Sequence, residues 1–261
     1  MLPGISEESE LQLAGCLRPE ITDLDAASLS QRQFEVLEPE AAAALGIEVT
    51  PGEDPILLVT DPQRRIGSVR LYCGGKNNVI AFDNAVWTGQ CNAVMRVLGS
   101  DCVVLMNDIG DGFVQMPTLL MRSDRQLLFW GKGASAVDVS LEIEGDGASL
   151  VIGDDALISN GVWIRNYDMH AIHDLASGAQ INRPPCNTVL ERHVWLGQDA
   201  LLLNCELVGM GSIVGARALV KGFVPPRCVV AGAPARVIRD GISWGRSSQG
   251  MTQQERTAIG L

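Results

Sequence analysis

Aromatic and basic residues are scarce in this sequence of 261 residues, and long hydrophobic runs are missing. Aromatics make up 5% of the chain, and 20 Lys and Arg stand against 31 Asp and Glu, which gives a formal net charge of −11. Because an acidic surface repels phosphate backbones, nucleic acid is not an expected partner. No stretch reaches the roughly 18 apolar residues of a membrane span, and the acidic start MLPGISEESE lacks the basic region of a secretory signal, so we expect a soluble, cytoplasmic protein.

Paired cysteines and clustered histidines are missing as well. The seven Cys are an odd number and include no C-x-x-C pair, which argues against a disulfide framework and against a zinc ribbon. We expect them to be small buried side chains in a reducing compartment. The chain has only three His, namely His170, His173 and His193, and we expect no bound metal.

Three regions of the chain differ in composition. Residues 1–65 mix acidic and Ala-rich stretches with Pro and Gly, and we expect a small helical or mixed N-terminal region that caps the remainder or helps to shape an acceptor site. Residues 66–239 are expected to form one domain, whose first part has the Val, Ile, Gly and Asn content of short strands joined by tight turns. Residues 240–261 are expected to form a short C-terminal tail.

An internal repeat of six residues decides the architecture. With one interruption, every sixth position is a branched aliphatic: Ile152, Ile158, Ile164, Leu190, Leu196, Leu202, Val208, Val214 and Val220. A small side chain or Val mostly follows four residues later, at Ala156, Val162, Val194, Ala200, Ser212, Ala218 and Val224. A period of six fits neither an α-helix nor a coiled coil, but it suits an all-β fold, a parallel β-helix whose short strands stack from coil to coil.

Two polar residues stand out within this repeat. Glu206 occupies a position where a small inward side chain is expected, and because an unpaired buried carboxylate is costly, we expect a local bulge that exposes it. His193 directly precedes a strand of the repeat, where a corner or outward residue is expected. We therefore expect a structural or surface role for His193 rather than a catalytic one.

Several motifs in the repeat region resemble those of the hexapeptide-repeat acyltransferases. They are Ile152-Gly153-Asp154-Asp155-Ala156, Val194-Trp195-Leu196-Gly197, Val208-Gly209-Met210-Gly211-Ser212-Ile213-Val214-Gly215-Ala216, Val224-Pro225-Pro226 and Ala231-Gly232-Ala233-Pro234-Ala235-Arg236-Val237-Ile238-Arg239. The resemblance covers about residues 150–240 and is faint over residues 75–150. It implies a left-handed parallel β-helix, a homotrimer, and acetyl-CoA lying between neighbouring subunits.

The interruption of the repeat predicts an inserted loop at residues 165–188, and this loop carries two of the three His. Acyl transfer to a hydroxyl needs a base with a pKa near neutrality, which imidazole provides. In the family the catalytic His often follows an Asp-x-His pattern, which Asp168-Met169-His170 matches, so the resemblance implies that His170 is the general base, with His173 as the alternative. Either Asp168 or Asp174 could orient the imidazole; their spacing does not decide, and the motif favours Asp168. His173 and Asp174 could equally form a solvated pair on the loop surface.

Candidate residues for donor binding lie in the late coils and just after them. Trp195 is expected to face outward, as a wall for CoA or for a neighbouring subunit. Small residues would let a thin pantetheine arm approach the backbone amides, although coil corners need small residues too. These residues are Gly197, Ala200, Ser212, Gly215 and Ala216. Lys221, Arg236 and Arg239 form a basic group suited to the phosphates of CoA, but Lys221 is displaced by one position from the lysine of the family's Thr-Lys-Asp.

The resemblance implies an acetyl-CoA-dependent O-acetyltransferase that acts by direct transfer on a sugar hydroxyl of a saccharide or glycan precursor. An N-acetyltransferase acting on an amino sugar and an amino-acid O-acetyltransferase are the alternatives within the family. The γ-carbonic anhydrases also have a left-handed β-helix but need three His on adjacent coils and adjoining subunits around zinc, a spacing that this sequence does not have. A noncatalytic scaffold is a further alternative, against which the Asp168 and His170 pair argues.

Overall fold

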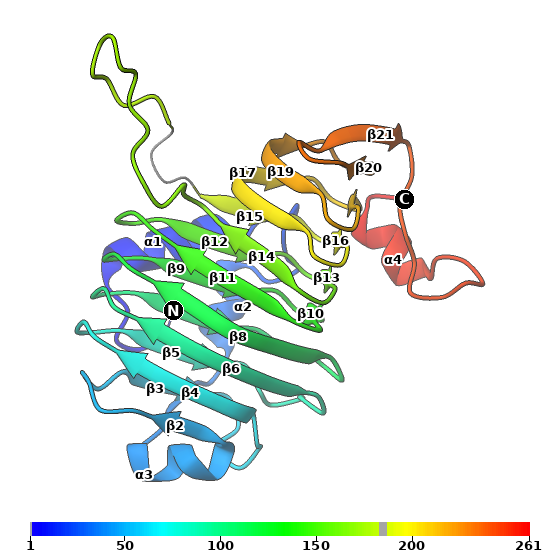
Figure 1. Ribbon diagram of the computed structural model, residues 1–261. Coiled ribbons are helices and arrows are strands. Elements are labelled where there is room, and N and C mark those ends of the chain that lie inside the picture. Colours follow the sequence, from blue (N-terminus) through cyan, green and yellow to red (C-terminus); the bar gives the residue numbers. More distant parts are fainter. Residues whose placement is uncertain (1, 183–186) are drawn as a thin grey trace.

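The computed structural model describes residues 2–182 and 187–261, and its strands form one continuous sheet wound into a parallel β-helix (Figure 1). In Figure 1 the coils rise from the N-terminal to the C-terminal end, while the strands of the near side run leftward and the chain returns behind them. This sense of winding is left-handed. The prediction of an all-β, left-handed parallel β-helix with a small N-terminal region and a C-terminal tail is therefore confirmed.

The helix has three faces, and the near face of Figure 1, which we call the open face, holds the longest strands. Its strands are β2 (Ile47–Val49), β4 (Gly67–Cys73), β6 (Gln90–Val97), β8 (Phe113–Met121), β11 (Val139–Ile143), β14 (Val162–Arg165), β17 (Leu201–Val208) and β19 (Leu219–Val224). Each pairs in parallel with the next. Buried and more exposed residues alternate along β4, as expected for a strand with one face on the core.

The second face, which we call the covered face, is buried on both sides. Its strands are β3 (Ile56–Val59), β5 (Val79–Phe82), β7 (Val103–Met106), β9 (Leu127–Trp130), β12 (Ser149–Ile152) and β15 (Thr188–Leu190), and the short β1 (Glu35–Val36) pairs antiparallel with β3. Every residue of β5, β7, β9 and β12 is buried. Parallel strands covered on both sides have such continuous apolar runs.

The third face, which we call the tail face, has the shortest strands. They are β10 (Ser135–Ala136), β13 (Leu157–Ile158), β16 (Trp195–Leu196), β18 (Ile213–Val214) and β20 (Cys228–Ala231), and β21 (Arg236–Asp240) closes the sheet by pairing antiparallel with β20. The tail then continues to helix α4 (Gln253–Ala258). Thr252 caps α4, because its hydroxyl accepts from the backbone of Glu255 while the Glu255 carboxylate accepts from the backbone of Thr252.

The six-residue repeat builds the core as expected. All nine aliphatic positions from Ile152 to Val220 are at most 2% exposed, and the seven positions that follow them by four residues are buried as well. The aliphatics stack from coil to coil, so Ile164 pairs with Leu202 and Leu202 with Val220. The prediction that these positions point inward and form ladders is confirmed.

The coils differ in length along the helix axis. On the open face Val94 lies 24 positions after its partner Arg70, whereas Val220 lies 18 positions after Leu202. Eighteen residues are three repeats of six, one for each face. The longer early coils do not fit that period, which explains why the repeat is faint before residue 150.

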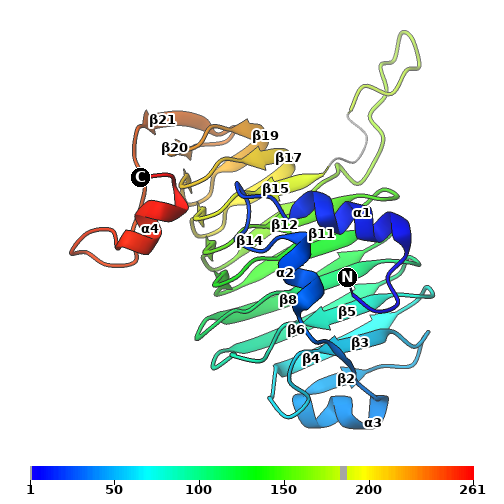
Figure 2. The same cartoon turned by 180° about the vertical axis from the view of Figure 1, so that it is seen from behind.

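The N-terminal region covers a flank of the β-helix as well as its end (Figure 2). Helices α1 (Glu7–Cys16) and α2 (Ala26–Gln31) lie over the covered face, where Leu13 and Leu29 belong to the same buried cluster as Phe129. Helix α3 (Pro39–Ala42) and the 3-10 turn η1 (Ala43–Leu45) lie at the N-terminal end. Since β2 and β3 already belong to the sheet, the coils begin within residues 1–65.

The described part of the chain bears on two further expectations. None of its helices is long and apolar enough to cross a bilayer. Its six cysteines are free and buried, and burial raises the pKa of the Cys91 thiol to about 12. The seventh, Cys186, lies outside the described residues.

Candidate functional site

After β14 the chain leaves the β-helix as an arm, which we define as residues 166–182. Figure 1 shows this arm extending away from the coils at the upper left. Within its described part, the backbone N–H of Ile181 donates to the oxygen of Ile172 at 2.8 Å, and that of Asp174 donates to Ala179 at 2.8 Å. The arm is thus a narrow hairpin that lies within the expected insertion at residues 165–188.

His170 and Asp168 lie at the base of the arm. The imidazole of His170 is exposed, and the His170 backbone N–H donates to the carbonyl oxygen of Asp168 at 2.9 Å. The side chain of Asp168 is only 12% exposed; one carboxylate oxygen lies 3.6 Å from Lys221 Nζ, and the other accepts from Asn182 Nδ2 at 3.3 Å. The carboxylate is therefore held by Lys221 and Asn182, and its predicted role in orienting His170 stays a prediction.

His173 and Asp174 lie further out on the arm, and both are solvent-exposed. His173 Nδ1 lies 3.2 Å from the oxygen of Gly178, and Asp174 accepts from the hydroxyl and the backbone N–H of Ser177, both at 2.7 Å. These bonds from Ser177 lower the pKa of Asp174 below its ordinary value. The pair closes the hairpin turn, as expected for solvated loop residues, and a catalytic role for either stays a prediction.

A cavity of about 470 Å³ opens where the base of the arm meets the last coils, and we call it the arm cavity. It is lined by Asp168, Ile172, Ile181 and Asn182 of the arm, Asn204 of β17, and Lys221 and Gly222 of β19. Sequence reasoning missed Asn204. The sequence did contain a signal for an irregular coil here, because Glu206, two residues later, breaks the repeat. In the structure β17 changes register on either side of Cys205. Glu206 is exposed there, as expected.

The small residues predicted to bind the donor are engaged within the coils. The backbone N–H of Gly197 donates to Val214 and that of Gly215 to Val230, both at 2.8 Å. The amides of Ala200 and Ser212 also donate within their own corner turns, and both side chains are buried. These N–H groups therefore already have acceptors within the coils. Contact between CoA and this edge, including the exposed Ala216, stays a prediction.

The remaining donor candidates are more accessible. Trp195 is partly buried on the tail face, and its indole N–H donates to Ser159 Oγ at 3.2 Å. Arg236 and Arg239 are exposed on β21 and are free to meet a polyanion. Lys221 is 52% exposed, and its ammonium faces Asp168 in the arm cavity.

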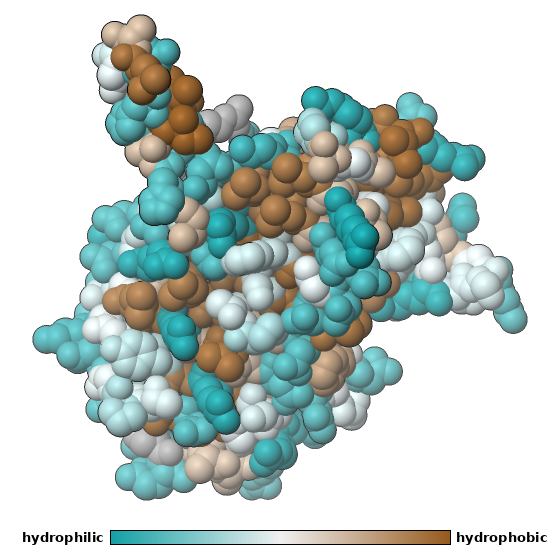
Figure 3. All heavy atoms as spheres, viewed as in Figure 1, coloured by the Kyte–Doolittle hydropathy of each residue, from teal (hydrophilic) through white to brown (hydrophobic). Residues whose placement is uncertain are grey.

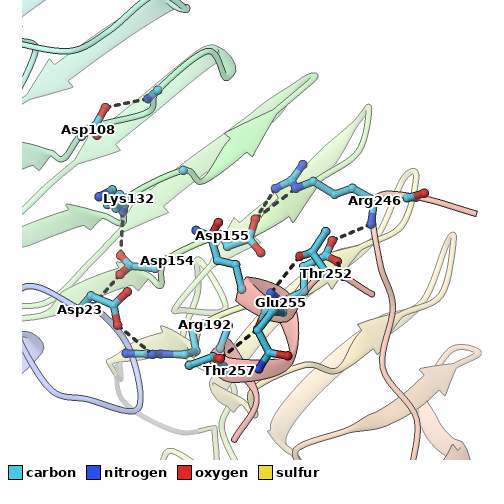
Figure 4. A pocket seen from close by; sticks show the side chains of 16 residues that line it. Asp23, Asp108, Lys132, Asp154, Asp155, Arg192, Arg246, Thr252, Glu255 and Thr257 are labelled. Carbon is cyan, nitrogen blue, oxygen red and sulfur yellow. Dashed lines mark hydrogen bonds and ion pairs between the residues drawn. The ribbon is translucent and has the colours of Figure 1, made fainter. Parts of the chain in front are cut away.

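A second cavity of about 630 Å³ lies between corner turns of the β-helix and the C-terminal tail, and we call it the tail cavity (Figure 4). The carboxylate of Asp154 accepts from the Thr22 hydroxyl at 2.9 Å and from the backbone N–H groups of Asp23 and Lys132, both at 2.7 Å. Burial nevertheless raises the pKa of Asp154. Arg192 Nη1 lies 2.9 Å from Asp23, so most charges in this cavity face a partner.

His193 anchors the C-terminal tail beside the tail cavity. The ring is fully buried and stacks on Trp244, with centroids 4.1 Å apart. Its Nδ1 lies 2.7 Å from Asp155 Oδ2, and its Nε2 lies 2.9 Å from the backbone oxygen of Trp244. Both partners are acceptors, so only a ring protonated on both nitrogens satisfies the two contacts together. The position is structural, as expected.

No group of three or more His, Cys, Asp or Glu in the described residues is placed to hold a metal ion. The base of the arm offers an exposed imidazole, His170, and the hydrogen-bonding groups of Asp168 and Asn182. An exposed imidazole on a rigid scaffold can remove a proton from a hydroxyl.

No family model matches the chain, but several curated proteins are similar to it. The polysialic acid O-acetyltransferase of Neisseria meningitidis is 36% identical over 174 residues, which are 64% of this chain and 78% of that protein. The galactoside O-acetyltransferase of Escherichia coli K12 is 30% identical over 95 residues, 36% of this chain and 46% of that protein.

The extent of the likeness varies among the relatives. For three other curated relatives the match spans half of their length or less, namely 50%, 37% and 46%. The solved structure of the polySia-specific acetyltransferase NeuO aligns with 81% of this chain and 96% of its own at 19% identity, with a TM-score of 0.46. The match over most of the meningococcal enzyme, together with the hexapeptide repeat, shows that this chain belongs to the hexapeptide-repeat O-acetyltransferases.

Proposed function

We propose that this protein transfers an acetyl group from acetyl-CoA to a hydroxyl of a saccharide. One observation carries the proposal: the chain matches 78% of a polysialic acid O-acetyltransferase, and its exposed His170 lies at the base of the arm, where the His170 backbone oxygen accepts from Asn182, a residue of the arm cavity, at 2.9 Å. The names of these relatives point to sialic acid polymers and galactosides as the first acceptors to test.

The reaction proceeds by direct attack without an acyl-enzyme. The His170 imidazole takes the proton of the acceptor hydroxyl while the hydroxyl oxygen attacks the thioester carbonyl. The tetrahedral intermediate collapses, the C–S bond breaks, and the sulfur leaves as CoA thiolate, which receives the proton from the imidazolium. A general base of this kind contributes on the order of 10²–10⁴ in rate.

The donor is assigned to the C-terminal coils. Arg236 and Arg239 on β21 supply positive charge in a chain of net charge −11, and this local reversal of sign suits the phosphates of CoA. Trp195 offers a flat apolar wall nearby on the tail face. A cytoplasmic location accompanies this assignment, because acetyl-CoA is made and used there.

A homotrimer is part of the same proposal. Figure 3 shows apolar side chains gathered over the upper coils of the open face, where β17 and β19 lie. Leu201, Leu203 and Leu219 are partly exposed there, and Trp163 of the neighbouring β14 is 41% exposed. A contiguous apolar patch of this kind fits a contact with a second copy of the chain. Sedimentation at two concentrations measures the oligomeric state.

The function is tested with purified protein, acetyl-CoA and a panel of sialic acid oligomers, galactosides and glucosamine, followed by release of free thiol. We expect thiol release with at least one hydroxyl acceptor. Acetyl-CoA at 100 times its Kd should also stabilise the folded protein by about 2.7 kcal/mol, which a thermal scan detects. Transfer only to the amine of glucosamine would show an N-acetyltransferase, and binding of acetyl-CoA without any turnover would favour a scaffold.

A further inference from the structure

The floor of the arm cavity contains a buried hydrogen-bond acceptor without a partner. Asn204 is only 5% exposed, and its Oδ1 atom accepts no hydrogen bond in the described part of the chain. Buried amide oxygens in folded proteins are nearly always paired, because leaving one unpaired costs the full desolvation of the group. Asn204 also lines the arm cavity, so a turn of its amide toward the cavity would let a ligand donor satisfy this enclosed oxygen.

The local backbone explains why Asn204 lines the cavity. The pairing of β17 with β19 shifts register between Leu202 and Cys205, and Asn204 adopts a left-handed conformation with φ of +51°. Asn tolerates this conformation better than most residues. Cys205 takes the buried core position, and its carbonyl oxygen accepts from the Thr188 hydroxyl at 2.7 Å. The contact with Thr188 thus holds Cys205 on the core side of the bulge, while its neighbour Asn204 lines the arm cavity.

The other lining groups indicate the chemical class of the ligand. Asp168 and Lys221 provide one negative and one positive charge, 3.6 Å apart, so their charges cancel. Asn182 adds an amide, and Ile172 and Ile181 add apolar side chains. Oxygen acceptors beside apolar side chains suit a ring with hydroxyl groups on its edge and C–H groups on its face. A phosphate fits poorly, because Asp168 would repel it.

We propose that Asn204 binds the acceptor saccharide, with Oδ1 accepting a hydrogen bond from a hydroxyl other than the one that is acetylated. This inference rests on the proposed function and adds a specificity-determining residue to it. A site built around an unpaired acceptor discriminates strongly, because an analogue without the hydroxyl leaves Asn204 unpaired again. Asn204 would hold the sugar close to the base of the arm, where the backbone oxygen of His170, the proposed base, accepts from the cavity residue Asn182 at 2.9 Å.

The test is Asn204→Gly, because glycine accepts the left-handed backbone and removes only the amide. The matched control is Asn77→Gly, which makes the same change at an exposed corner residue with φ of +57°, far from the cavity in the fold. With the panel saccharide of highest kcat/KM, we expect N204G to raise the KM for the saccharide at least tenfold. The KM for acetyl-CoA should stay within twofold of wild type, and N77G should change neither value.

The possible results separate this inference from the proposed function. If wild type transfers acetyl groups and N204G keeps the wild-type saccharide KM, the inference is overturned and the proposed function stands. A rise confined to the KM for acetyl-CoA also overturns it, since Asn204 would then contact the donor. A wild type that acetylates no saccharide overturns both.

A second measurement covers the case in which N204G does not fold. Wild type is assayed with monodeoxy analogues of the same saccharide, each lacking one hydroxyl that is not acetylated. We expect at least one analogue to lose tenfold or more in kcat/KM. Equal turnover of all analogues would show that no such hydroxyl is bound, and the inference would fail.

Discussion

The tail cavity and the arm cavity hold their polar groups in different ways. In the tail cavity Asp154 accepts three hydrogen bonds, and Asp155 contacts both His193 and Arg246 at 2.7 Å. In the arm cavity the Asn204 oxygen has no partner among the described residues. The polar groups of the tail cavity thus bond segments that are distant in the sequence to one another, whereas the arm cavity has an acceptor that a ligand could still bind.

The difference shows how a stabilising cluster can be told from a binding site. One buried atom of the tail cavity, Arg192 Nε, also lacks a partner, but the charge of that side chain is compensated by Asp23 at 2.9 Å. Paired groups stabilise the folded chain, while an unpaired acceptor costs stability that a ligand can restore. Volume alone is misleading here, because the larger cavity is the one whose groups are mostly paired.

The largest effect is expected from removing the proposed base, His170. His170→Ala should lower kcat on the order of 10²–10⁴-fold, because the acceptor hydroxyl then loses its proton acceptor. The thermal shift with acetyl-CoA should remain as in wild type, since the exposed imidazole contributes little to folding. Free-thiol release measures the first quantity and a thermal scan the second.

The matched control for this variant is His173→Ala, the same substitution three residues further along the arm. It should keep nearly the wild-type kcat. If H173A loses activity and H170A does not, the two histidines exchange roles, and the assignment of the base to His170 is wrong.

A smaller effect, on stability rather than rate, is expected in the tail cavity. Asp155→Ala removes the partner of His193 and Arg246 and should lower the free energy of unfolding by about 1.5–3 kcal/mol, the usual value for hydrogen bonds to charged groups. Urea unfolding measures this change. The KM for the saccharide should not change, and a large rise would mean that the tail cavity also serves the acceptor.

The same variant has a predictable pH dependence. Burial alone would raise the pKa of Asp155, but hydrogen bonds from His193 and Arg246 outweigh burial and hold the pKa below its ordinary value. A carboxyl with a lowered pKa stabilises the fold above its unfolded-state pKa of about 3.9 and loses this contribution as the pH falls through the folded-state value. The stability gap between wild type and D155A should therefore persist from pH 7 to 5 and shrink below about pH 4. A gap that widens in acid would contradict this account.

The smallest effect is expected from Lys221→Ala. An ion pair with an exposed partner, such as Lys221 with Asp168, contributes about 0.2–1 kcal/mol of interaction free energy. If all of this is lost from saccharide binding, the KM for the saccharide should rise by no more than about fivefold. Lys132→Ala, at an exposed lysine of the tail cavity, is the control and should change no kinetic constant. A rise in the KM for acetyl-CoA in K221A would instead return Lys221 to the phosphate role considered from the sequence.

Particular residues show how far the sequence could lead. Features that follow or break the six-residue period were predictable from the sequence. The ladder positions from Ile152 to Val220 follow the period, whereas the inserted loop and the bulge at Glu206 interrupt it. The acceptors of the Gly197 and Gly215 amides could not be predicted. They are Val214 and Val230, which lie 17 and 15 positions further along on the next coil, and no local pattern describes such a contact.

The sequence by itself determined the β-helix, because a parallel β-helix repeats the same local environment every six residues and so leaves its period in the chain. The sequence also indicated the inserted loop, with His170 and His173, as the place to look for the base. Only the tertiary structure decided which polar groups are paired, since Asp154 meets Thr22 across 132 positions and His193 meets Trp244 across 51. The same holds for Asn204, whose missing partner can be recognised only when every group around it is in place.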